Sequence, residues 1–197
     1  MKEKICNFEC SEAELREFLK NVEDGLVKKD FDAYSLDVIL KCIDLYDRNQ
    51  ISYKYLTLWV DAYAFFFEPF IDAELSKKEL LLFQIADFVC SLAYYEREQT
   101  DTLSWSIDTF LLFDSIYNNL DKWDLSYSFT KGQYYDGIVN TIDAILVNHT
   151  DMKYIWLGKS YKGEKRISID GKWLSLTELN FYETELSNMG FEKLKKF

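Results

Sequence analysis

Helix-breaking residues are scarce in this chain of 197 residues, which contains one proline, Pro69, and seven glycines. Proline and glycine are the residues that most often interrupt regular structure, so their scarcity favours long helices joined by short connections. Apolar residues make up 48% of the chain and aromatic residues 17%, which is enough to fill a core without disulfide bonds. We therefore expect a mainly α, compact multi-helix domain of about six to seven helices.

Three segments carry the Ser-x-x-Glu pattern of a capping box, in which the serine and the glutamate satisfy free amide groups at a helix start. They are Ser11–Glu14, Ser76–Glu79 and Ser175–Glu178. Apolar residues at helical spacing predict the helices themselves, over residues 11–24, 35–48, 52–67, 76–98, 102–120, 133–148 and 176–188. The third and fourth of these are apolar nearly all round, which predicts helices covered by others on most sides.

The pattern changes after His149. Lys153–Leu157 and Lys165–Ile169 are predicted to be short strands, and Asp170-Gly171 suits a two-residue turn into a third. We therefore expect a small antiparallel β-hairpin or meander near the C-terminus, followed by a helix that ends at Gly190. The predicted organisation is a single domain, 1–197, with an acidic helical body over 1–151 and a β-hairpin plus C-terminal helix over 152–197.

The net charge of −11 is distributed unevenly. Residues 1–151 hold 14 basic and 28 acidic side chains, whereas residues 152–197 hold nine basic and six acidic ones. Nucleic-acid binding depends on clustered Lys and Arg, so this balance argues against a nucleic-acid partner and favours a basic protein partner.

The four cysteines are widely spread and predict free thiols in a reducing compartment, which with the charged N-terminal start favours a cytoplasmic protein. Cys6 and Cys10 lie four residues apart in a terminus expected to be unstructured, and no second Cys/His pair could complete a zinc site. The apolar stretches Leu56–Phe67 and Leu80–Tyr95 are too short and too polar to span a bilayer, so we expect no membrane association.

Catalytic chemistry finds little support in the sequence. The one histidine, His149, is expected just past a helix end, where an imidazole can cap carbonyl groups. No phosphate-binding loop or nucleophile motif occurs, so we expect no enzyme, no metal and no cofactor. The carboxylates leave one alternative open, a small metal-dependent hydrolase that would use residues such as Asp121 and Asp124.

Two aspartates, Asp61 and Asp87, stand within the most apolar helical segments. Both lie on narrow polar stripes at helical spacing. We expect them to reach solvent or a partner on a neighbouring helix.

From Gln99 to Asp151 every acidic residue is an aspartate, and aromatic residues are interspersed among them. Acidic side chains that steer a partner, together with aromatic side chains that bury against it, are what a tight binder of a basic protein needs. The predicted partner-binding residues are Asp101, Trp105, Asp108, Asp121, Trp123, Asp124, Tyr127, Tyr135, Asp136 and Asp143.

In size, acidity, absence of catalytic motifs and low-proline composition, the chain resembles the immunity proteins that bacteria pair with polymorphic or contact-dependent toxins. The resemblance is one of general composition across the whole chain. It implies a cytoplasmic protein that binds and neutralises a cognate toxin, often a basic nuclease, through an acidic surface. A helical adaptor that binds a peptide or partner helix is the other alternative.

Overall fold

The computed structural model describes residues 1–69, 75–95, 101–125, 141–159, 162, 164–169, 172–175, 184 and 186–194. It divides into two compact units, Met1–Asp114 (unit 1) and Ser115–Phe197 (unit 2). The architecture is mainly α, with an antiparallel sheet toward the C-terminus, as the sequence predicts.

The helices of unit 1 follow the predicted segments closely. Their bounds are α1 Lys2–Asn7, α2 Glu12–Glu23, the short 3₁₀ helix η1 Phe31–Ala33, α3 Leu36–Asp47, α4 Tyr53–Ala64, α5 Lys77–Tyr95 and α6 Asp101–Tyr117, the last of which ends in unit 2. Within the described part of the chain, every helix is too short or too polar to cross a bilayer.

Capping chemistry explains where these helices begin. At α2 the Ser11 hydroxyl accepts a hydrogen bond from the Glu14 amide, and the Glu14 carboxylate accepts one from the Ser11 amide at 2.8 Å. Ser76 and Glu79 repeat the arrangement before α5, with corresponding distances of 3.3 and 2.9 Å. Both predicted capping boxes are confirmed, whereas Glu178 of the third lies outside the described residues.

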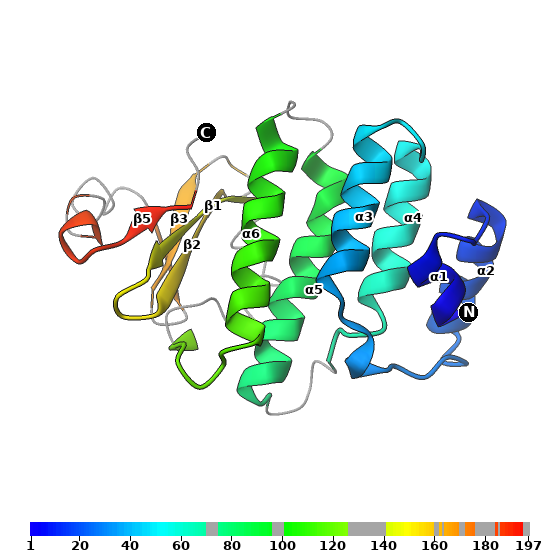
Figure 1. The fold of residues 1–197 in the computed structure, drawn as a ribbon, viewed down its shortest axis with the longest axis horizontal. Coiled ribbons are helices and arrows are strands. Elements are labelled where there is room, and N and C mark those ends of the chain that lie inside the picture. The colour runs from blue at the N-terminus through cyan, green and yellow to red at the C-terminus, as the bar shows by residue number, and fades with distance from the viewer. Residues whose placement is uncertain are drawn as a thin grey trace. The chain divides into compact units, whose positions relative to one another are not determined.

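Helix α4 occupies the centre of unit 1, where it contacts α1, α2, α3 and α5 (Figure 1). Its buried rings Trp59 and Tyr63 stack at 4.8 Å, and the half-buried Phe8, which follows α1, stacks on Trp59 at 4.9 Å. The Tyr63 hydroxyl accepts a hydrogen bond from the Ser35 amide at 2.8 Å. A helix covered on most sides needs apolar residues nearly all round, which is what the sequence predicts for this segment.

The N-terminus differs from the prediction. Residues expected to be unstructured form α1, which ends at Phe8 in a left-handed conformation with φ 62°. The Trp59 indole N–H donates a hydrogen bond of 3.0 Å to the Ile5 carbonyl and so joins α1 to α4. Cys10 is buried, and Met1 Sδ is 3.7 Å from its thiol.

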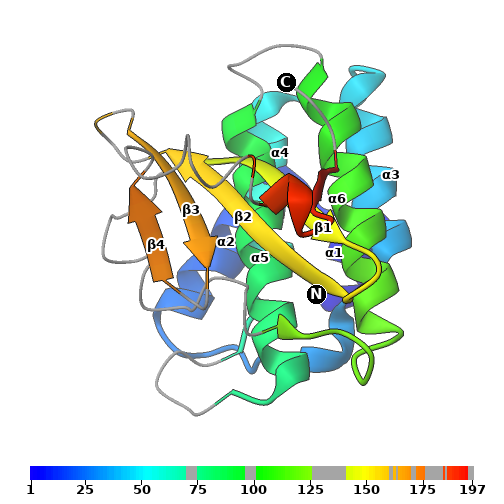
Figure 2. The ribbon, with the colours of Figure 1, turned by 90° about the vertical axis from the view of Figure 1, so that its left-hand side faces the viewer.

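Unit 2 contains a five-stranded antiparallel sheet in the order β4-β3-β2-β1-β5 (Figure 2). The strand bounds are β1 Thr141–Asn148, β2 Lys153–Lys159, β3 Lys165–Ile169, β4 Lys172–Ser175 and β5 Glu192–Lys193. Because β1 to β4 are consecutive neighbours in the sheet, the predicted C-terminal β-meander is confirmed. It has one strand more at its start than the sequence indicated.

That additional strand corrects the sequence prediction. Residues 133–148 were expected to form a helix in an acidic helical body over 1–151, but Thr141–Asn148 is strand β1. The spacing of the apolar residues in this segment fits both the helical repeat of 3.6 residues and the strand repeat of two residues. Pairing with β2 favours the strand, with Ile145 opposite Trp156 and Val147 opposite Tyr154. His149 consequently lies in the exposed β1–β2 turn and not past a helix end.

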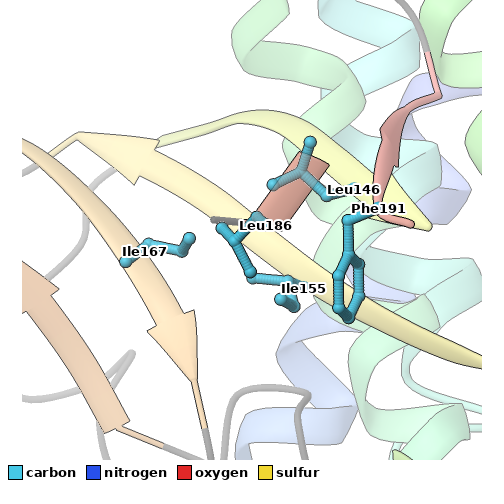
Figure 3. Packing of buried hydrophobic residues seen from close by; sticks show 5 residues of the cluster. All are labelled: Leu146, Ile155, Ile167, Leu186 and Phe191. Carbon is cyan, nitrogen blue, oxygen red and sulfur yellow. The ribbon is translucent and has the colours of Figure 1, made fainter. Parts of the chain in front are cut away.

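One face of the sheet carries a hydrophobic cluster made of Leu146, Ile155, Ile167, Leu186 and Phe191 (Figure 3). Phe191 folds back toward the preceding helical residues, since its amide donates a hydrogen bond of 2.9 Å to the Leu186 carbonyl. Gly190 permits this reversal because its φ of 82° is left-handed, a conformation that favours glycine. Of the predicted last helix, Thr184 and Leu186–Asn188 lie within the described residues and are helical.

Candidate protein-binding face

Helix α6 has an inner and an outer face that differ in chemistry. Its inner face packs on α5, where the Phe88 ring meets Phe110 and Phe113 edge to face at centroid distances of 5.1 and 5.8 Å. The helix contains three aspartates and no lysine, arginine or histidine. Its carboxylates therefore have no basic partner on their own helix.

Among the described side chains of α6 in unit 1, the outer face consists of Ile107, Asp108, Leu111 and Asp114. Leu111 is 49% exposed, and the other three side chains are half-buried. At 100° per residue, Asp108 and Asp114 lie on opposite sides of Leu111, because each is three positions away from it. The α6 outer face therefore presents an apolar side chain between two carboxylates.

The acidic surplus of the whole chain belongs to unit 1. Residues 1–114 hold 12 basic and 23 acidic side chains, a net charge of −11, whereas residues 115–197 hold 11 of each. In the described residues of unit 1, six basic side chains make ion pairs with carboxylates: Lys2–Asp30, Lys4–Glu14, Lys29–Glu68, Arg48–Asp44, Lys54–Glu12 and Lys78–Asp32. The excess of carboxylates persists after this internal pairing.

Three of the predicted partner-binding residues lie on α6. Asp108 belongs to the outer face. Asp101 and Trp105 are in the first turns of the helix, where the side chains lie outside the described residues. The structure thus brings Asp108 together with Leu111 and Asp114, which the sequence analysis did not select. An apolar residue on the polar side of the helical wheel was the signal that could have identified Leu111.

The predicted residues of unit 2 occupy different environments. Asp121 is exposed in the turn after α6, whereas Trp123 is buried at 2% exposure. The Trp123 ring meets the rings of Tyr154 and His149 edge to face at 6.2 and 6.5 Å. Trp123 is therefore a packing residue of unit 2 in this conformation.

Asp124 is tied to the β1–β2 turn. Its amide donates a hydrogen bond of 2.9 Å to the Met152 carbonyl, and its carboxylate lies 3.9 Å from Lys153 Nζ. Asp143 lies on β1 with its side chain outside the described residues. Three further predicted residues lie outside the described residues altogether: Tyr127, Tyr135 and Asp136.

A metal centre is not assembled by the part of the chain that the structure describes. Within it, no group of three or more His, Cys, Asp or Glu side chains could hold a metal ion. The described surroundings of Asp124 contribute a lysine, which competes with a cation for the carboxylate.

A second carboxylate feature lies between α4 and α5. Asp87 is half-buried and so reaches solvent in part, as expected, whereas its Oδ2 is shielded from solvent and makes no hydrogen bond. Burial, together with the negative charge of Glu68, raises the pKa of Asp87 to about 7. Burial also raises the pKa of Asp61, although this side chain is more exposed.

Comparison of the chain with family models, curated proteins and solved structures finds no match.

Proposed function

We propose that this chain is an immunity-type inhibitor, which binds and neutralises a cognate bacterial toxin through the α6 outer face. The observation that carries the proposal is Leu111, 49% exposed between Asp108 and Asp114 on a helix without basic residues. Binding surfaces commonly combine an apolar anchor with a charged rim that selects the partner. The partner chemistry that matches this face is a basic protein surface with an apolar pocket.

The charge of unit 1 supports a basic partner such as a nuclease. The active cleft of a nuclease is positive because it must receive phosphates, so it also attracts carboxylates. A net charge of −11 concentrated in residues 1–114 would accelerate encounter with such a cleft over distances of about a Debye length, roughly 10 Å in moderate salt.

A cytoplasmic site of action fits the cysteines. Cys6, Cys10, Cys42 and Cys90 are all free thiols. Burial raises the pKa of Cys42 well above its usual range and so suppresses its reactive thiolate. Unpaired, unreactive thiols are what a reducing compartment favours, and a toxin inhibitor that protects its own cell would act there.

The test measures affinity for the toxin domain encoded beside the gene, together with inhibition of that toxin. The wild-type chain is expected to inhibit it, with affinity that falls as salt rises from roughly 0.05 to 0.5 M. The Asp108→Asn/Asp114→Asn double variant should bind at least roughly tenfold more weakly, mainly through slower association. Leu111→Ala should instead accelerate dissociation.

The matched control is Asp37→Asn/Asp47→Asn, which removes two exposed carboxylates from α3 and changes the net charge equally. If the control weakens binding as much as the α6 variant, general charge and not the α6 outer face determines affinity. If the affinity changes neither with salt concentration nor in either double variant, the acidic-face proposal is contradicted. A neighbouring gene without any toxin domain would contradict the immunity role itself.

A further inference from the structure

The Asp87 carboxyl group lies in an environment that disfavours its charged form. It belongs to a half-buried residue in the middle of α5, a helix in which Phe83, Ala86 and Phe88 are buried. Its Oδ2 is closed to solvent and makes no hydrogen bond to the protein. An ionised carboxylate without such partners is costly inside a protein, whereas the neutral acid is tolerated.

The groups around Asp87 add to this penalty. Glu68, which follows α4, acts on Asp87 with a like charge. Glu68 in turn binds the cation Lys29, whose Nζ lies 3.5 Å from the Glu68 carboxylate and donates a hydrogen bond of 3.0 Å to the Glu68 carbonyl. Lys29 also lies over the Phe65 ring at 5.3 Å.

The other titratable groups of the packed helices do not neutralise Asp87. On α5 itself, the Cys90 thiol is neutral because burial, and then the charges of Asp61, Asp87 and Glu68, raise its pKa. On α4, Asp61 is a third carboxylate. Helix α6 packs on α5 through Phe88, and its described carboxylates, Asp108 and Asp114, belong to the outer face. The pKa of Asp87 is thus set by burial and by the like charge of Glu68, and both raise it.

We propose that Asp87 is a proton-sensitive contact of the α4–α5 helix pair, closed when its carboxyl group is neutral and loosened when ionisation places a buried anion beside Glu68. The direction follows from linkage. The pKa in the folded protein, about 7, lies above the ordinary value of 3.8. The contact therefore contributes its full stability at low pH and loses it as pH rises through about 7.

The first experiment observes the titration in the unaltered full-length chain. The ¹³C chemical shift of the Asp87 carboxyl, identified by its loss in Asp87→Asn, should change with a midpoint near pH 7. Glu68→Gln should move that midpoint downward, because it removes the like charge and releases Lys29. A midpoint below about pH 5 in the wild-type chain, or no downward change in Glu68→Gln, would overturn the proposal.

The second experiment measures opening of the helix pair by amide hydrogen exchange in α4 and α5. After correction for the intrinsic pH dependence of exchange, wild-type protection should fall roughly tenfold between pH 6 and pH 8. Asp87→Asn should abolish that fall, whereas the control Asp47→Asn, an exposed aspartate of α3, should retain it. Equal falls in wild type and Asp87→Asn would show that ionisation of Asp87 does not loosen the contact. Should Asp87→Asn not fold, the wild-type titration and Glu68→Gln decide the matter.

Discussion

The side-chain amide of Asn148 donates a hydrogen bond of 2.7 Å to the backbone carbonyl of Met189, 41 residues further along the chain. The same amide donates to the Asp151 carboxylate at 3.1 Å, and the Asn148 side-chain oxygen accepts from the amides of Thr150 and Asp151 at 2.9 Å each. Asn148 is 2% exposed. One buried side chain therefore fixes the β1–β2 turn and ties it to the C-terminal segment.

Replacing this residue should destabilise unit 2. Asn148→Ala leaves the Met189 carbonyl and two turn amides without their partner, and we expect a loss of about 2–3 kcal/mol in the free energy of unfolding. Urea unfolding measures the loss, and faster amide exchange in β1 and β2 would locate it. Asn7→Ala, at an exposed position of α1, is the control and should stay within about 0.5 kcal/mol of wild type. A loss no larger than that of the control would contradict the role of Asn148.

Alanine variants at two glycines with positive φ can distinguish destabilisation by backbone strain from destabilisation by steric crowding. Gly25 has φ 69° with open space where a Cβ would be, and Gly190 has φ 82° with Asn148 Nδ2 3.5 Å from that position. This distance is an ordinary contact, so strain alone should set the penalty of alanine at both sites, about 1 kcal/mol each. Thermal unfolding of Gly25→Ala and Gly190→Ala should give similar losses. A much larger loss for Gly190→Ala would show that the Asn148 contact is tighter than described.

The capping box of α2 predicts a specific pH dependence. Hydrogen bonds from the Ser11 amide, the Lys4 ammonium and the Ser11 hydroxyl lower the pKa of Glu14 to about 2. Because the folded-state pKa is depressed, the contribution of Glu14 is present above the ordinary pKa of 4.5 and is lost as pH falls through about 2. Ser11→Ala should cost about 1 kcal/mol at neutral pH, and Ser115→Ala, at an exposed position of α6, should cost nothing. Unfolding measured across acidic pH should show that the stability difference between wild type and Ser11→Ala becomes smaller as pH approaches 2.

The bond between Trp59 and Ile5 should hold α1 in place. Trp59→Phe preserves an aromatic ring between Phe8 and Tyr63 but leaves the buried Ile5 carbonyl without the indole N–H that it accepts at 3.0 Å. Because the Ile5 carbonyl also accepts a hydrogen bond of 3.2 Å from the Phe8 amide, we expect a loss of only about 0.5–1.5 kcal/mol, with faster amide exchange confined mainly to α1. Exchange that accelerates equally in α1 and α5 would instead indicate a general core defect.

Local sequence was sufficient where local interactions decide the structure. The helix start at Ser11 requires only a serine oxygen and a glutamate three residues later, and the structure has both hydrogen bonds. The left-handed turn at Gly190 and the return of Phe191 to Leu186 likewise involve neighbours in the chain. Among the candidate site residues, Asp108 was selected from sequence and lies on the α6 outer face.

Local sequence was insufficient where the same residues fit both a helical and a strand repeat. The segment containing Thr141, Ile142, Ile145 and Val147 is rich in β-branched side chains, a signal for a strand that the helical spacing outweighed. Its pairing partner, β2, begins only at Lys153, and a single segment carries no information about such a partner. The burial of Trp123 likewise depends on a distant segment, because Trp123 packs against Tyr154 of β2.

By itself, the sequence determined the helix starts, the mainly α composition, the C-terminal hairpin and the net charge, because each depends on residue type or near neighbours. Only the tertiary structure decided that 141–148 is a strand, that the Asp87 Oδ2 is shielded from solvent and that residues 1–114, which hold the acidic surplus, form one compact unit. These outcomes depend on which distant segments pack together, since burial and strand pairing are set by neighbours in space and not by neighbours in the chain.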